Sequence, residues 1–149
     1  MAFKPVYFSF SGVSITPQGG SAILLKETTR LRIIRRENLE EWQGSGDQFS
    51  TLFAVSKSDR GCSIEGADIN LHLTIPANTA CAITGTILHP KNGTGEGALT
   101  FTLANAVLQD SSFGAESRRF AGGGVEFLAY SSDGTTDPMT FAVAPAPGG

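Results

Sequence analysis

Charged residues are scarce in this sequence, where they make up 17% of 149 residues against about a quarter in an average globular protein. The formal net charge is −3, so the chain lacks the basic excess that nucleic-acid-binding domains carry. Glycine, by contrast, is abundant at 18 residues. Low charge with many glycines favours short strands and tight turns over helices. The composition therefore predicts a mildly acidic β protein without specific nucleic-acid binding.

Long apolar runs are also absent. No run approaches the roughly 20 residues that a membrane-spanning helix needs, so we expect no membrane partner. The opening residues carry a single lysine and no long apolar segment, which does not fit a secretory signal, and we expect folding in the cytoplasm. The length fits one β domain, 1–149, with a flexible N-terminal arm at 1–5 and a flexible tail at 144–149.

Cysteine and histidine occur twice each, as Cys62, Cys81, His72 and His89. These residue types suit zinc, but the close C-x2-4-C pairing of structural zinc sites is missing. We therefore predict two core cysteines and two surface histidines, with no metal and no cofactor. A disulfide is geometrically open if the strands that carry the two cysteines are neighbours, but a reducing cytoplasm disfavours it.

One glycine-rich segment, with Asn92, Gly93 and Gly95 as loop candidates, superficially matches a phosphate-binding loop. Such a loop needs a following helix whose N-terminus meets the anion. Residues 98–103 alternate instead as in a strand, so a flexible hairpin loop is the better interpretation. A G-x-S-x-G nucleophile motif is also absent from the sequence, and we predict that the protein is not an enzyme.

Two aspartates, Asp133 and Asp137, lie in the turn-forming stretch 131–138. Carboxylates clustered in a loop can hold calcium. Aspartate in a turn more often accepts hydrogen bonds from its own backbone, and we favour that interpretation.

Apolar and polar residues alternate with a period near two along most of the chain, interrupted by Pro and Gly turns. This predicts an all-β, single-domain antiparallel β-sandwich or barrel. The absence of βαβ alternation disfavours an α/β nucleotide-binding fold. The expected strands are 6–15, 22–26, 31–36, 62–66, 69–75, 81–88, 99–108, 117–130 and 139–143, and 49–55 fits either a helix or a strand.

The stretch 37–47 is ambiguous. Residues 37–43 fit two helical turns stopped by the glycines at 44–46, which would add one short helix to the fold. The same stretch fits the polar tip of a long hairpin, and isolated helices this short are weak.

The densest charge block, within 27–41, overlaps the start of this stretch. Mixed charges give an interface specificity and register more than affinity, so the block is a candidate contact between subunits. Trp42 fits an interface anchor, although packing on its own domain is equally expected. The contact candidates are Arg35, Arg36, Glu37, Glu40, Glu41 and Trp42.

Three stretches, 98–108, 124–138 and 8–15, together resemble tail-tube-like virion proteins of tailed phages and prophages. In that family a strand ending near "NAV" and a later strand "V-x-F-x-A-x-S-x-D-G" lie in one barrel. The resemblance covers about half of the chain. Family members usually have a helix flanking the barrel, and this sequence has no clear one.

The resemblance implies a β subunit that assembles with copies of itself into rings, usually sixfold, which stack into a hollow tube in the virion tail. DNA would pass through without specific binding, and other tail proteins would be partners. A long hairpin would reach the adjacent ring, and 36–48 is the candidate. Alternatives are a head–tail connector or tail-completion protein, or a carbohydrate-binding β-sandwich, for which one Trp and two Tyr are few.

Overall fold

The computed structural model describes residues 12–46, 48–49, 52–66, 74–76, 78–87, 98–118 and 121–143. Within these residues the chain is antiparallel β-sheet without an α-helix, so the all-β prediction is confirmed. In the described part, no helix has the length and hydrophobicity to cross a membrane. The strands are β1 (Val13–Pro17), β2 (Ile23–Leu25), β3 (Thr28–Trp42), β4 (Leu52–Gly66), β5 (Cys81–Ile87), β6 (Leu99–Gly114), β7 (Gly122–Ala129) and β8 (Met139–Val143).

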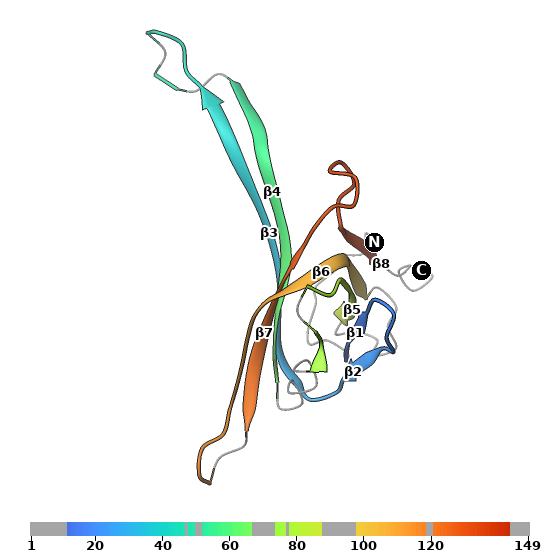
Figure 1. Cartoon of the computed structure of the whole chain (residues 1–149). Coiled ribbons are helices and arrows are strands. Elements are labelled where there is room, and N and C mark those ends of the chain that lie inside the picture. Colours follow the sequence, from blue (N-terminus) through green and yellow to red (C-terminus); the bar gives the residue numbers. More distant parts are fainter. Residues whose placement is uncertain are drawn as a thin grey trace, which may run out of the picture.

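All eight strands belong to one sheet with the order β2-β1-β5-β6-β7-β4-β3, and β8 pairs with β6 outside this path. Strand β6 divides the sheet in two (Figure 1). Its first half pairs with β5 and β8 in the body of the molecule, and its second half pairs with β7. We call the second half of β6, together with β7, β4 and β3, the blade. The order leaves β2 and β3 as unpaired ends, so the described strands form an open sheet instead of a closed barrel.

One hydrophobic core joins the two parts of the sheet. Ile15 and Ile83 of the body belong to the same buried cluster as Ile64 and Phe127 of the blade. These side chains lie on one face of their strands because side chains alternate with a period of two. The sheet therefore folds over its own core, as the predicted sandwich would.

The β3–β4 hairpin reaches far beyond the body (Figure 1). Its register runs from Thr28↔Gly66 to Trp42↔Leu52, but only the Arg60-to-Gly66 part of β4 also pairs with β7. The hairpin interpretation is thus confirmed for 37–46, the described part of that stretch, and the helix alternative is wrong. Pairing along the whole of β3 outweighs the weak helical tendency of seven residues.

A loop at 130–138 interrupts the strand that β7 and β8 would otherwise form along β6. Ala129 pairs with Ala106, and Met139 pairs with Leu103. Asn105, between these pairs, has a φ of 53°. The Tyr130 amide donates to the Asn105 carbonyl at 3.1 Å, and the Ala104 amide to the Pro138 carbonyl at 2.8 Å. These bonds fix both ends of the loop, which projects beside the base of the hairpin.

Several predictions concern residues outside the described part: the strands expected in 6–11 and 69–73, the loop with Asn92, Gly93 and Gly95, His72 and His89, and both terminal segments. Elsewhere the observed strands overlap the expected ones, but Thr74 and Ile75, expected to end a strand, and Ser117 and Arg118, expected to begin one, lie outside the strands. Cys62 and Cys81 are buried and free. Their strands, β4 and β5, are separated by β6 and β7, so the expectation that they could be neighbours is wrong.

Candidate functional site

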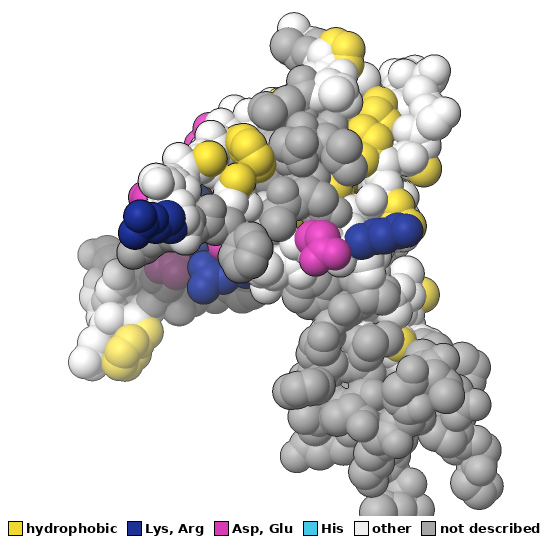
Figure 2. Space-filling view, turned by 90° about the horizontal axis from the view of Figure 1, so that it is seen from below, with side chains coloured by type: hydrophobic (Ala, Val, Ile, Leu, Met, Phe, Trp, Pro, Cys, Tyr) yellow, Lys and Arg dark blue, Asp and Glu magenta, His cyan; other side chains and the backbone are white. Residues whose placement is uncertain are grey.

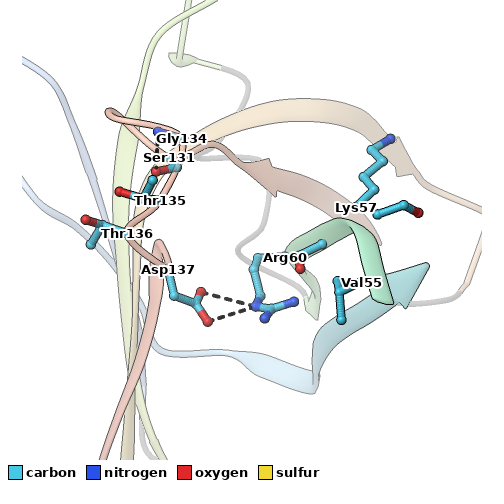
Figure 3. A pocket seen from close by; sticks show the side chains of 10 residues that line it. Val55, Lys57, Arg60, Ser131, Gly134, Thr135, Thr136 and Asp137 are labelled. Carbon is cyan, nitrogen blue, oxygen red and sulfur yellow. Dashed lines mark hydrogen bonds and ion pairs between the residues drawn. The ribbon is translucent and has the colours of Figure 1, made fainter. Parts of the chain in front are cut away.

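The side chain of Arg60 lies almost fully buried at the base of the protruding hairpin, 7% exposed. Arg60 pairs with Ala129 at the last point where β4 touches β7. Its Nε donates to both carboxylate oxygens of Asp137, at 3.1 and 3.2 Å (Figure 3). Its Nη2 lies 2.6 Å from Glu37 Oε1, and its Nη1 donates to the Asp59 carbonyl at 3.0 Å. One guanidinium thus joins β3, β4 and the 130–138 loop.

The charges in this cluster support one another. Burial opposes the charge of Arg60, but its hydrogen bonds to Glu37 and Asp137 outweigh that and raise its pKa. The Ser58 hydroxyl and Arg60 both donate to Glu37 and lower its pKa. Partial burial works against ionisation of Asp137, but the Met139 amide and Arg60 donate to its carboxylate and lower its pKa. All three groups are therefore charged at neutral pH.

The 130–138 loop is organised by Asp133. Its Oδ1 accepts from the amides of Thr135 at 2.8 Å and Thr136 at 2.7 Å and from the Ser131 hydroxyl at 2.9 Å. Its Oδ2 accepts from the Thr136 hydroxyl at 2.7 Å. These bonds, first that of the Thr136 hydroxyl and then those of the Thr136 and Thr135 amides, hold the pKa of Asp133 well below its ordinary value. The backbone-bonding interpretation of Asp133 is confirmed.

Asp133 and Asp137 hold different partners, which does not support the calcium alternative. In the part of the chain that the structure describes, no group of three or more His, Cys, Asp or Glu side chains is arranged to hold a metal ion.

An open cleft of about 480 Å³ separates the loop from the hairpin. Its wall is rich in hydroxyl groups, several of which appear with Arg60 and Asp137 in Figure 3. Ser58 donates to Glu37, but a carboxylate with a lowered pKa is a poor general base. The arrangement suits polar contact with another surface more than catalysis. The lining residues are Val55, Ser56, Lys57, Ser58, Arg60, Ser131, Gly134, Thr135, Thr136 and Asp137.

Large apolar side chains stand exposed on the protruding part of the hairpin. Leu39, 52% exposed, lies opposite Val55 on the face that also carries Glu37. Trp42, 58% exposed, lies opposite Leu52 on the other face. The alternative prediction, that Trp42 packs into its own domain, is thus wrong. The view from below likewise shows separate exposed hydrophobic patches among few charged side chains (Figure 2).

The structure divides the predicted contact residues between the two faces of the hairpin. Arg35, Glu37 and Glu41 alternate onto the face of the cleft, whereas Arg36, Glu40 and Trp42 lie on the other face. A β-bulge at Ser56, whose hydroxyl donates to the Asn38 carbonyl at 3.1 Å, shifts the register of the two strands between Asn38 and Leu39.

Sequence reasoning missed Arg60 and Ser58. A signal existed for Arg60, because it alternates in phase with the buried Cys62 and Ile64 on β4.

No protein-family model and no curated protein matches this chain. Solved structures match it along nearly its whole length. A chain of the anti-feeding prophage baseplate, 6-fold symmetrised, superposes with a TM-score of 0.61 at 12% identity, covering 95% of this chain and 97% of that one. This chain shares its fold with a chain of a prophage baseplate. The resemblance inferred from sequence is confirmed at the level of the fold.

Two further matches agree. A chain of the PVC sheath–tube complex, from an extracellular contractile injection system in the extended state, gives a TM-score of 0.57 at 14% identity, covering 94% of this chain and 91% of that one. A chain of the anti-feeding prophage tube-terminating cap gives 0.61 at 12% identity, covering 97% and 95%. At such identities the matches establish the fold of the chain, and its function rests on further argument.

Proposed function

We propose that this chain is a structural subunit of a phage-tail-like particle and, more specifically, a tube subunit that forms stacked, hexameric rings. The whole-length fold match to a chain of a sheath–tube complex carries this proposal. The 6-fold symmetrised baseplate supports the ring size. Partners would be further copies of the chain and other tail proteins, and the site of action would be the tail of the particle.

The two edges of the blade support ring formation. Strand β3 pairs only with β4, and residues 107–114 of β6 pair only with β7 within the described part of the chain. Unpaired edges of this kind are templates for another strand. Directions alternate along β6-β7-β4-β3, so β3 and β6 run antiparallel to each other. Rotation about a ring axis leaves the direction of each strand along that axis unchanged. The β3 edge of one copy could therefore pair with the β6 edge of its neighbour, which would continue the antiparallel sheet and leave neither edge unpaired.

The protruding hairpin supports stacking of the rings. Its exposed pairs, Leu39 with Val55 and Trp42 with Leu52, place large apolar side chains in water on both faces. Apolar surface of this kind marks contact sites. In a stack, the hairpin would extend to the adjacent ring and cover these side chains. The net charge of −3 fits a conduit through which DNA passes without being held.

The test is electron microscopy and mass photometry of the purified chain over a range of concentrations. Hollow tubes would support the tube subunit. Single rings that never stack would favour a terminating subunit instead, because the same fold occurs in a tube-terminating cap. A monomer at every concentration, even with preformed tail ends added as nuclei, would contradict the proposal.

The variant Leu39→Ser/Val55→Ser distinguishes the contact between neighbours within a ring from the contact between stacked rings. Both side chains are about half exposed, so the fold is expected to persist. Rings should form, and stacking into tubes should be lost. Ser14→Thr, a conservative change on β1 in the body, is the control and should leave tubes unchanged.

A further inference from the structure

A row of four side chains crosses the blade from one open edge to the other. Arg32 on β3 pairs with Ser63 on β4, Ser63 pairs with Glu126 on β7, and Glu126 pairs with Asp110 on β6. Directly opposed residues share a level and a face of the sheet. The row therefore begins with a cation at the β3 edge and ends with two carboxylates toward the β6 edge.

The two ends of this row are available to a partner. Arg32 and Asp110 are both exposed, and neither forms an ion pair with any residue in the described part of the chain. The neighbouring Arg30 differs, because its Nη1 lies 3.9 Å from Glu65 within the same blade.

We propose that a second copy of this chain docks its β6 edge on the β3 edge of the first, with Asp110 facing Arg32 across the seam. This rests on the proposed function and names the contact within the ring. The charges complement each other only in the head-to-tail arrangement. Pairing of two β3 edges would bring arginines together, and pairing of two β6 edges would bring aspartates together. The row thus directs association toward closed rings and away from twofold dimers.

Oxidative cross-linking of the full-length variant Arg32→Cys/Asp110→Cys tests the contact. Within one chain these positions are three interstrand spacings apart, about 14 Å, which no disulfide spans. The native Cys62 and Cys81 are buried and do not compete. We expect a ladder of covalent oligomers under denaturing, non-reducing conditions that ends at the size of the ring. Each single-cysteine variant should give no species beyond a dimer.

Arg36→Cys/Asp110→Cys is the matched control. Arg36 lies on the same face of β3 as Arg32, but its partner Asp59 lies beyond the last β4–β7 pair. In the proposed register Arg36 lies four residues further along β3 than Arg32, roughly 13 Å from the level of Asp110, so this variant should give no ladder. A ladder from the control, or none from Arg32→Cys/Asp110→Cys, would overturn the proposed register.

Charge reversal tests the ion pair separately. Asp110→Arg should reduce association at least tenfold, and adding Arg32→Glu to it should restore most of that loss. A double variant no better than the single one would overturn the role of the charges.

The two proposals fail in different ways. Hollow tubes in the microscope without the ladder would overturn this contact and leave the tube subunit standing. A ladder without rings or tubes would support the contact and contradict the tube subunit. The absence of both would overturn both.

Discussion

Replacing Arg60 by methionine is the most informative single perturbation of this structure. Methionine keeps much of the apolar stem that arginine packs in its buried position, and it removes the charge and all of the donors. The change removes the ion pairs by which position 60 on β4 is joined to Glu37 on β3 and to Asp137 in the 130–138 loop. We therefore expect a stability loss that reflects the ion cluster and little else.

The magnitude follows from the exposure of the partners. A hydrogen bond to a charged group contributes about 1.5–3 kcal/mol, and the loss is largest when a charge is left buried. The side chain of Asp137 is 43% exposed and would regain water, which reduces the loss. We expect Arg60→Met to lower the free energy of unfolding by about 2 kcal/mol. For a chain of this size, that corresponds to roughly 4–8 °C in Tm.

A double-mutant cycle with Asp137→Asn isolates the pair. Urea unfolding of the two single variants and the double variant should give a coupling energy of about 1 kcal/mol. Hydrogen exchange should speed up selectively at the base of the β3–β4 hairpin, because Arg60 joins the hairpin to the loop there. Strictly additive single losses would refute the view that the guanidinium and Asp137 stabilise each other.

Acid gives an independent check. The pKa of Asp137 is lowered from 3.8 and that of Glu37 from 4.5. A group whose pKa is lowered in the folded state stabilises the protein at pH values above its unfolded-state pKa. This stabilisation is lost as the pH falls through the folded-state pKa. The difference between wild type and Arg60→Met should therefore be largest above about pH 5 and shrink below pH 4. An equal difference at pH 7 and pH 3 would show that the carboxylates do not contribute.

Three further predictions concern the core and the loop. Gly85→Ala should lower the unfolding free energy by about 1–3 kcal/mol, since a Cβ there would lie 2.5 Å from Cε1 of the buried Phe101; thermal unfolding measures this, and an unchanged Tm would contradict the close packing. The Cys62 thiol should resist a thiol reagent until the chain unfolds, because burial raises its pKa to about 12, with a smaller contribution from the charge of Glu126. Rapid labelling of Cys62 in the native protein would refute its burial. Since the unfolded thiol ionises near pH 9, the free energy of unfolding should fall as the pH rises from 9 toward 12. Asp133→Ala removes the acceptor of the loop's hydrogen bonds and should expose residues 130–138 to limited proteolysis, whereas Ser132→Ala, which leaves those bonds intact, should not.

Local chemistry made much of the fold predictable. Alternating apolar residues located strands such as β5 and β8, because a strand that buries one face repeats every two residues. Asp133 beside Gly134 indicated a turn for an equally local reason, since a short carboxylate reaches amides two and three residues ahead. The resemblance to tail-tube-like proteins likewise rested on short strand motifs, and the fold confirms it.

The features that carry the functional argument depend on contacts between distant parts of the chain. Residues 37–42 form a strand because β4 pairs with them, although their own sequence also fits a helix. The charge of Arg60 is tolerated in its buried position because the 130–138 loop brings Asp137, 77 residues later in the chain, into hydrogen-bond contact with it.

The sequence by itself determined a mildly acidic, antiparallel β chain with its turns in place. Which edges of the sheet stay open, and that Arg32 and Asp110 end the same row, were decided only by the tertiary structure. The physical reason is that strand order and register are set by pairing between distant strands and by burial of one common core. The sequence of a short segment does not specify which distant strand it will pair with.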